Sequence, residues 1–353
     1  MADNLHIDGV AIGKNQPVFI IAELSANHNG SLEVALETIK AAKRAGADAI
    51  KLQTYTADTM TINSTKEDFC IKQGTVWDGR LLYELYQKAY TPWEWHEALF
   101  AAARAEGLVC FSSPFDRTAV DLLESLGNPA YKIASFEITD IPLIEYVASK
   151  GKPVIISTGI AEEEDIELAL DTCRRQGNNQ VALLKCTSGY PAPIGEVNMC
   201  MVKDLETRFN VVSGLSDHTL GITVPVVAVA FGAAIIEKHF ILDRSLGGPD
   251  ASFSLNEQEF TEMVKAVRDA SLAIGKVDYS LTDKQRSGRE FSRSLYIVED
   301  MKAGDVFTPE NIRSIRPGFG LHPKHYEAVL GKTITNDAGK GTPLSFQLIH
   351  QPQ

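Results

Sequence analysis

The sequence predicts an α/β protein in which a (β/α)₈ barrel of the TIM type is followed by a small β-rich C-terminal domain. Two observations predict this fold. Short apolar runs alternate with amphipathic stretches along roughly the first 240 residues, and after Gly275 the chain changes to short segments punctuated by turns. With 353 residues, the chain is long enough for one large domain and one small domain.

Eight apolar runs of five to eight residues are the predicted strands. They are residues 18–25 (VFIIAELS), 49–55 (AIKLQTY), 109–115 (VCFSSPF), 131–135 (YKIAS), 154–158 (VIIST), 181–187 (VALLKCT), 211–218 (VVSGLSDH) and 233–240 (AAIIEKHF). The stretches between them, such as residues 31–45 (SLEVALETIKAAKRA), repeat apolar residues at steps of three and four and therefore predict helices.

The near-continuous apolar character of these strands indicates a parallel sheet that is buried on both faces. Eight strand–helix units in about 250 residues indicate that the sheet closes into a barrel. An open, doubly wound sheet is the alternative. Such a sheet ordinarily carries a glycine-rich first turn, whereas the first turn here reads ELSANHNGS.

Two segments depart from the regular pattern. The connection after the second predicted strand, residues 56–80, is long, and long loops in compact domains are usually lids or binding loops, although a plain surface insertion is the alternative. Past Gly275, a charged stretch (LTDKQRSGREFSR) leads into the turn-rich segments. We therefore expect a catalytic barrel at residues 1–280, a linker at 281–293 and a small domain at 294–353.

Charge and composition exclude several classes of partner. The formal net charge is −12, so nucleic acid and anionic membranes are not expected partners. The N-terminal segment has no signal-peptide pattern and no apolar stretch approaches the roughly 20 residues of a membrane span, so a cytoplasmic protein is expected. The five cysteines form no CxxC pair, and Cys110 and Cys186 lie in apolar runs typical of reduced, buried thiols.

Every predicted strand ends in polar or charged residues, which is where the active site of such a barrel lies. The seventh strand ends Ser216-Asp217-His218 and the eighth ends Glu237-Lys238-His239. Since adjacent strands lie about 4.8 Å apart, two histidines at these ends could chelate one cation of the Mn²⁺ or Zn²⁺ type. One core histidine and one solvated histidine would be the simpler explanation.

Three lysines, Lys51, Lys132 and Lys185, lie within apolar strand segments, although lysine is seldom buried without a partner. Hydroxyl groups cluster near the same strand ends: Ser112-Ser113, Ser135, Ser157-Thr158, Thr187-Ser188 and Ser216. Ammonium and hydroxyl donors together predict a site for phosphate or carboxylate. A Schiff base on one lysine is the other possible use.

Two glutamates, Glu23 and Glu137, complete the predicted site. A carboxylate there can hold substrate hydroxyls or move protons to and from water, and an ordinary ion-pair partner is the alternative. Lys132 and Ser135 have opposite strand parity, so they cannot both face the site from a regular strand. The chain must therefore leave strand geometry near Ala134.

The sequence resembles the sialic acid synthase family over essentially its whole length. The motifs are AELSANHNG, KLQTY, FSSPFD, YKIASFE, ISTG, KCTSGYPAP, GLSDHT, EKHF, GGPD and IRPGFG, in the family's order. The resemblance implies an enzyme that condenses phosphoenolpyruvate with an amino sugar to give a nonulosonic acid. It also implies a divalent metal (Mn²⁺ or Mg²⁺) and a C-terminal domain similar to type III antifreeze protein (SAF).

Within the family, the segments DTMTIN, WDGR, YTPWEWH, FEITDIPLIEYVASKGKP and RSIRPGFGLHP are similar to pseudaminic acid synthases. The sugar would then be 2,4-diacetamido-2,4,6-trideoxy-β-L-altropyranose. An N-acetylneuraminic or legionaminic acid synthase is the alternative within the family.

The resemblance also implies roles for individual residues. His218 and His239 match the metal ligands, and the catalytic positions are Glu23, Glu137 (water-handling) and Lys132. Positions that bind phosphoenolpyruvate are Lys51, Ser113, Lys132, Ser135, Ser157, Ser188 and Ser216, where Ser188 stands in place of an asparagine usual in the neuraminic acid enzymes. Positions on the sugar side are Gln53, Tyr190, Glu237, Asp250 and Arg316. Arg316 would come from the small domain of a second subunit, so a homodimer is expected.

Two alternatives from other classes remain. A Schiff-base pyruvate aldolase would use Lys51, Lys132 or Lys185. A non-catalytic protein with a carbohydrate- or ice-binding C-terminal module would have no need of the polar strand ends.

Overall fold

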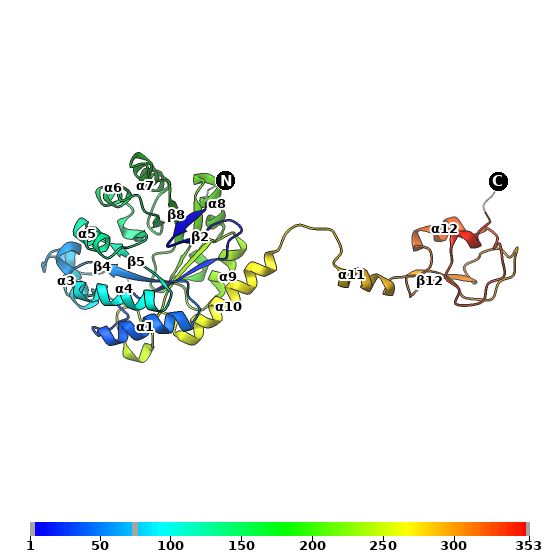
Figure 1. The fold of residues 1–353 in the computed structure, drawn as a ribbon, viewed down its shortest axis with the longest axis horizontal. Coiled ribbons are helices and arrows are strands. Elements are labelled where there is room, and N and C mark those ends of the chain that lie inside the picture. Colours follow the sequence, from blue (N-terminus) through cyan, green and yellow to red (C-terminus); the bar gives the residue numbers. More distant parts are fainter. Residues whose placement is uncertain (1–3, 73–76, 351–353) are drawn as a thin grey trace. The chain divides into compact units, whose positions relative to one another are not determined.

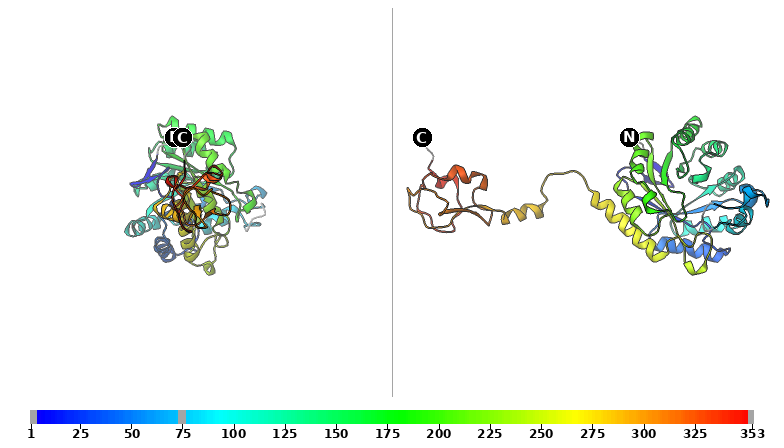
Figure 2. Two further views of the ribbon diagram at one scale, coloured as in Figure 1. Left: turned by 90° about the vertical axis from the view of Figure 1, so that its right-hand side faces the viewer. Right: turned by 180° about the vertical axis from the view of Figure 1, so that it is seen from behind.

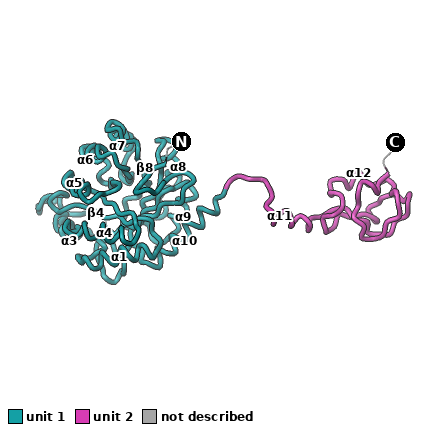
Figure 3. Tube along the Cα trace, viewed as in Figure 1, with its two compact units in different colours: residues 1–275 teal, residues 276–353 magenta. Residues whose placement is uncertain are grey.

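The computed structural model describes residues 4–72 and 77–350, which form two compact units, Met1–Gly275 and Lys276–Gln353 (Figure 3). The first unit is a closed barrel of eight parallel strands in the order β10-β3-β4-β5-β6-β7-β8-β9. Its strands are β3 (Phe19–Glu23), β4 (Ala49–Thr54), β5 (Val109–Pro114), β6 (Tyr131–Ile133), β7 (Val154–Ser157), β8 (Val181–Cys186), β9 (Val212–Asp217) and β10 (Ile235–His239). The predicted (β/α)₈ barrel is confirmed.

Helices surround the strands, as Figures 1 and 2 show from two sides. They are α1 (Leu32–Arg44), α2 (Ala57–Met60), α3 (Leu82–Ala89), α4 (His96–Ala105), α5 (Arg117–Ser125), α6 (Ile141–Ala148), α7 (Glu163–Arg175), α8 (Cys200–Phe209), α9 (Thr223–Ala230) and α10 (Glu257–Ile274). In the part of the chain that the structure describes, no helix is long and apolar enough to span a membrane.

Helix α1 illustrates why these segments fold locally. The Ser31 side chain accepts a hydrogen bond from Val34 N and caps the first turn, while Lys43 and Arg44 lie in the last turn, where cations favour the helix dipole. Its buried face, which includes Ala35 and Ile39, joins the large core cluster between the strands and the helices.

A second core cluster fills the barrel itself and contains no residue from the surrounding helices. It includes Phe19, Phe111 and Ile155 from the strands. A short antiparallel hairpin of β1 (Leu5–Ile7) and β2 (Val10–Ile12), not predicted from the sequence, contributes Leu5, Ile7 and Ile12 to the same cluster.

The second unit contains α11 (Asp283–Gly288) and α12 (Tyr326–Val329), and an antiparallel pair of strands, β11 (Ser294–Ile297) and β12 (Ile312–Ile315). Isolated antiparallel bridges elsewhere in the unit, such as Met301 to Ala338, add further β-type pairing. Its small core has its own members, among them Leu295, Phe307 and Ile334. The predicted small β-rich domain is therefore confirmed, while the expected limits of the linker (281–293) stay a prediction.

Candidate active site

The barrel interior changes from apolar to polar toward the C-terminal ends of the strands. Ile21, Phe111 and Ile155 belong to the interior core, and the residues two positions later on the same face are Glu23, Ser113 and Ser157. The same step on β4, β6, β8 and β10 leads to Lys51, Lys132, Cys186 and Glu237, and on β9 Ser216 lies four positions after the core residue Val212. Together the polar layer consists of Glu23, Lys51, Ser113, Lys132, Ser157, Cys186, Ser216 and Glu237, and all eight residues are buried.

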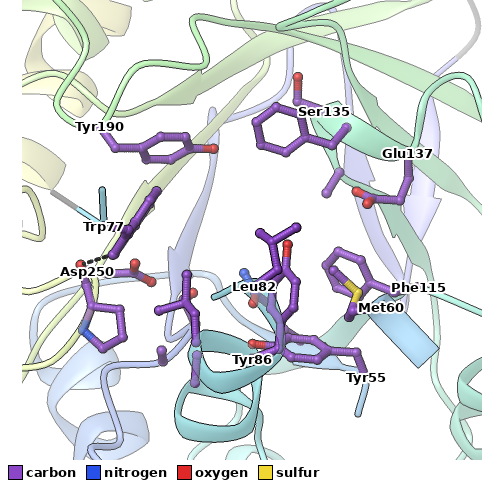
Figure 4. A pocket seen from close by; sticks show the side chains of 18 of the residues that line it. Tyr55, Met60, Trp77, Leu82, Tyr86, Phe115, Ser135, Glu137, Tyr190 and Asp250 are labelled. Atoms are coloured by element: carbon purple, nitrogen blue, oxygen red, sulfur yellow. Dashed lines mark hydrogen bonds between the residues drawn. The ribbon is translucent and has the colours of Figure 1, made fainter. Parts of the chain in front are cut away.

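Above the polar layer lies a cavity of about 610 Å³ (Figure 4). The predicted site residues that line it are Glu23, Lys51, Gln53, Lys132, Ser135, Glu137, Ser157, Tyr190, Ser216, His218, Glu237, His239 and Asp250. Ser113 and Ser188 lie just behind this lining, bonded to Lys51 and Ser135 respectively. Arg316 belongs to the second unit.

Two lysines and two glutamates form a buried ionic cluster at the floor of the cavity. Lys51 Nζ lies 2.5 Å from Glu23 Oε2 and 3.8 Å from Glu237 Oε2. Lys132 Nζ donates to Ser157 Oγ at 2.6 Å and lies 3.7 Å from Glu237 Oε1, which accepts a hydrogen bond from Ser216 Oγ at 2.9 Å. The cluster is formally neutral when all four groups are charged.

Burial shifts the pKa values of these groups in different directions. It raises the pKa of Glu23 to about 7, although the nearby Lys51 opposes the shift. Burial also raises the pKa of Glu237, but Lys132 and Lys51 outweigh it, and the net pKa is lowered. Burial lowers the pKa of Lys132, whereas for Lys51 the neighbouring glutamates outweigh burial and raise the pKa.

Lys185 does not belong to this cluster, so grouping it with Lys51 and Lys132 was wrong. On β8, Leu184 lies in the interior core and Leu183 in the outer core, so Lys185 shares the outward face with Leu183. Its Nζ donates to the Cys186 carbonyl at 2.9 Å, and Lys185 does not line the cavity.

The predicted break in strand geometry near Ala134 is confirmed. Strand β6 ends at Ile133, and a single 3₁₀ turn, Ser135–Glu137, follows. Because of this turn, Lys132, Ser135 and Glu137 all line the cavity despite their parity. Burial raises the pKa of Glu137 to about 7, and its Oε2 is buried without a hydrogen-bond partner.

Three loops form a small cradle of hydroxyl and amide groups beside Lys132. Ser135 Oγ lies 2.9 Å from Ser188 Oγ and accepts a hydrogen bond from Ile160 N at 3.1 Å. Gly159 packs so closely here that a β-carbon would collide with both serine hydroxyls. These groups are suited to binding an anion, and Gly159 was not singled out in the sequence.

We expect Gly159→Ala to raise the KM for the anionic substrate by about 10- to 100-fold, because the added methyl group displaces the serine hydroxyls, each hydrogen bond to a charged group being worth about 1.5–3 kcal/mol. Steady-state kinetics measure the effect. Gly195→Ala is the matched control, since a β-carbon there meets nothing within 4 Å. An unchanged KM in Gly159→Ala would contradict the role of the cradle.

His218 and His239 lie side by side at the ends of β9 and β10, with ring centroids 5.2 Å apart. Burial lowers the pKa of His218 to about 4 and that of His239 well below its ordinary value, so both imidazoles are neutral near pH 7. His239 Nδ1 is buried without a hydrogen-bond partner and lies 3.6 Å from Asp250 Oδ2. Neutral imidazoles with a free ring nitrogen fit a divalent metal.

Within residues 4–72 and 77–350, no group of three or more His, Cys, Asp or Glu side chains is arranged to hold a metal by itself. A metal held by the two histidines would need water or substrate to complete its coordination shell. Positions open to water or substrate are typical of catalytic rather than structural metal sites.

Sequence reasoning missed two side chains around the histidines. Phe253 is fully buried, and its ring lies 5.0 Å from that of His239 and 5.4 Å from that of Tyr190, which in turn lies 4.6 Å from His218. Cys186 is a free, buried thiol, as predicted, but its Sγ faces the cavity 3.7 Å from His218 Nδ1. Strand parity with Leu184 could have revealed Cys186, whereas Phe253 lies in a loop where no period applies.

Comparisons with known proteins match both units. The NeuB family model matches residues 38–279 and the SAF domain model residues 292–349. The chain is 51% identical over 330 residues to "Pseudaminic acid synthase" of Campylobacter jejuni (94% of this chain, 96% of the relative) and 49% identical to that of Helicobacter pylori (94% and 97%). A crystal structure of N-acetylneuraminic acid synthetase from Leptospira borgpetersenii is 31% identical, with a TM-score of 0.73 over 82% of this chain and 95% of that one.

Proposed function

The chain belongs to the NeuB family, and from this premise we propose that it condenses phosphoenolpyruvate with 2,4-diacetamido-2,4,6-trideoxy-β-L-altropyranose and water to give pseudaminic acid and phosphate. It is an enzyme, a phosphoenolpyruvate-dependent nonulosonic acid synthase. The observation that supports the choice of sugar is that relatives named pseudaminic acid synthases are about half identical to it, against 36% for a legionaminic acid synthase of Legionella pneumophila.

The ionic cluster and the cradle supply the contacts that phosphoenolpyruvate needs. Lys51 and Lys132 are the buried cations of the cavity floor, and the serine hydroxyls of the polar layer surround them. We propose that the carboxylate and phosphate of phosphoenolpyruvate displace Glu23 and Glu237 as partners of the lysines, with the phosphate in the cradle of Ser135 and Ser188.

A divalent metal, Mn²⁺ or Mg²⁺, held by His218 and His239 would supply Lewis-acid polarisation of the sugar's aldehyde oxygen. The protein's own part is to place phosphoenolpyruvate so that its C3 lies about 3–3.5 Å from the aldehyde carbon. Gln53, Tyr190, Glu237 and Asp250 line the same cavity and are proposed to orient the sugar.

Glu137 is proposed to handle the water. When C3 of phosphoenolpyruvate bonds to the aldehyde carbon, C2 becomes electron-poor. A water oxygen then bonds to C2 while Glu137 accepts its proton, and phosphate departs with the electrons of the C2–O bond. Glu23, whose pKa is also raised by burial, is proposed to donate a proton to the sugar's aldehyde oxygen as the C–C bond forms, and the C2 hydroxyl loses its proton to water as phosphate leaves and the keto group forms.

This role predicts the pH profile of kcat/KM. Because the pKa of Glu137 is about 7, its carboxylate form is lost as the pH falls through 7, and kcat/KM should fall about tenfold per unit below that. Glu137→Gln should lower kcat about 100-fold or more and remove this limb. Glu23→Gln is the matched comparison. If the fall of kcat/KM below pH 7 disappeared in Glu23→Gln and remained in Glu137→Gln, the general base would be Glu23 and not Glu137.

We further propose that the enzyme is a cytoplasmic homodimer in which Arg316 completes the sugar site of the other subunit. Within the second unit, Arg316 is exposed, and the loop that carries it is held by Ser294, whose Oγ donates to the Pro317 carbonyl at 2.7 Å and accepts from Gly320 N at 2.9 Å. A planar guanidinium suits a carboxylate or the acyl oxygens of the sugar.

Mixing two inactive chains, Arg316→Ala and His239→Ala, should restore activity. If the arginine acts in trans, each mixed dimer has one site with both lesions and one intact site, so up to about half of that dimer's activity returns. Activity is measured after subunit exchange has been verified with tagged chains. No recovery would contradict completion in trans.

The proposed function is tested by phosphate release from phosphoenolpyruvate with three sugars in parallel: the altro-configured diacetamido sugar, its legionaminic precursor and N-acetylmannosamine. We expect the altro-configured diacetamido sugar to be preferred. A site that hydrogen-bonds the 6-hydroxyl group would strongly reject a sugar that lacks this group, whereas an apolar site accepts the 6-deoxy sugar. Preference for N-acetylmannosamine would overturn the proposed sugar and leave the family unchanged. Borohydride trapping of a covalent pyruvate adduct, without phosphate release, would indicate the aldolase.

A further inference from the structure

One side of the cavity is an apolar and aromatic wall, defined here as Tyr55, Met60, Leu82, Tyr86 and Phe115 and called the tail wall. Figure 4 shows these five side chains gathered on one side, with Tyr190 and Ser135 across the cavity from them. Met60 ends α2, at the start of the predicted long connection, and Leu82 begins α3, just after it; Tyr86 also lies on α3, while Tyr55 and Phe115 directly follow β4 and β5.

Aromatic packing and a helix-to-helix hydrogen bond fix the tail wall in place. Tyr55 is buried, and its ring packs edge-on against Tyr86 at 5.7 Å and against Phe115 at 5.2 Å. Tyr83 Oη donates to Asp58 Oδ1 at 3.0 Å and so joins α3 to α2. Thr56 caps α2 in a reciprocal pair with Thr59. Met60 and Leu82 therefore lie on supported elements.

The rest of the cavity lining includes the polar groups of the reaction site. His218 and His239 adjoin the ionic cluster, and Asp250 and Gln53 offer further hydrogen-bonding groups. The reacting aldehyde of the sugar must meet phosphoenolpyruvate at this polar end, so the far end of the sugar, carbons C4 to C6, has the rest of the cavity to occupy. Thioether, isobutyl and phenyl groups offer no hydrogen bonds to replace the water that a polyol tail loses on binding.

We propose that the tail wall determines specificity by receiving the C6 methyl group and the C4 acetamido methyl group of the sugar. The C6 methyl group and the methyl end of the C4 acetamido group bury apolar surface against Met60, Leu82 and Phe115, whereas a 6-hydroxyl group at that place would meet no strong hydrogen-bond partner among these three side chains. This inference rests on the proposed function and adds to it the side chains that select a 6-deoxy sugar.

The test compares two substrates within each variant: the 6-deoxy diacetamido sugar and its 6-hydroxy analogue. Met60→Gln and Leu82→Asn change polarity with little change of shape. Met201→Gln on α8 and Leu272→Asn on α10 are matched controls, because both of these side chains are exposed and neither lines the cavity. The ratio of the two kcat/KM values does not depend on the fraction of folded enzyme, and the KM for phosphoenolpyruvate is measured alongside.

We expect the wild type and both controls to favour the 6-deoxy sugar by about 10- to 100-fold, and Met60→Gln and Leu82→Asn each to lower that ratio about tenfold, with the KM for phosphoenolpyruvate unchanged. A ratio that stays at the wild-type value in both wall variants would overturn the role of the tail wall while the proposed function stands. A wild type that turns over N-acetylmannosamine but not the 6-deoxy sugar would overturn the proposed function, and the tail-wall inference with it.

Discussion

Replacing His239 with glutamine should abolish binding of one equivalent of Mn²⁺ and lower kcat/KM about a thousandfold or more, because Lewis-acid stabilisation of several kcal/mol is lost and each 1.36 kcal/mol is tenfold in rate. His239 has a buried ring nitrogen without a hydrogen-bond partner, and its imidazole lies beside that of His218, so we expect the two residues to share one metal ion. His218→Gln should behave in the same way.

Mn²⁺ binding is measured directly by the EPR signal of the free ion, which does not depend on turnover. Treatment of the wild type with EDTA should remove activity, and added Mn²⁺ should restore it. His6→Gln serves as the control for imidazole at the surface, since His6 is exposed on β1. Full activity in EDTA-stripped enzyme, or wild-type Mn²⁺ affinity in both histidine variants, would contradict the proposed metal site.

Replacing Lys132 with methionine should lower kcat/KM for phosphoenolpyruvate about 10- to 100-fold, because one charge-assisted contact worth about 1.5–3 kcal/mol is lost and Glu237 keeps one cationic neighbour fewer. Lys185→Met is a closely matched control: it removes a lysine of the barrel that lies on the opposite face of its strand. Lys185→Met should change kcat/KM less than about threefold, because Lys185 does not line the cavity and its Nζ donates to the Cys186 carbonyl.

Binding of phosphoenolpyruvate without the sugar, measured by calorimetry, separates affinity from chemistry in the Lys132→Met variant. If Lys132→Met and Lys185→Met lost the same affinity for phosphoenolpyruvate, removal of any barrel lysine would disturb the fold. Wild-type affinity in Lys132→Met would show that the lysine of β6 does not bind phosphoenolpyruvate.

Strand period and strand parity made most of the barrel predictable. Alternation placed Ser216 with His218 and Glu237 with His239, and each pair does line the cavity. The conflict between Lys132 and Ser135 predicted a break in the strand, and the 3₁₀ turn after Ile133 confirms it. These inferences succeed because side chains alternate between the two faces of a barrel strand, and the two faces have different environments. Once one side chain of a strand is assigned to a face, the faces of the others follow.

The site residues that were misjudged or missed are those for which strand parity was not considered, or which lie outside strands. Lys185 was grouped with Lys51 and Lys132 by residue type, although its strand neighbour Leu184 already takes the inward face. Phe253 and the tail wall lie on loops and on helices α2 and α3, where contacts across the cavity, and not a local period, decide which side chains meet. Gly159 has no side chain to attract notice, and only the packing shows that nothing larger fits.

The proposed reaction is tested most directly with phosphoenolpyruvate that carries ¹⁸O in the oxygen bridging C2 and phosphorus. The enzyme is incubated with this compound and the altro-configured diacetamido sugar, and the phosphate and sugar products are analysed by mass spectrometry and NMR. We expect one nine-carbon α-keto acid for each phosphate and ¹⁸O in the phosphate, because water attacks C2 and the C2–O bond breaks. Unlabelled phosphate, or phosphate released without a nine-carbon acid, would contradict it.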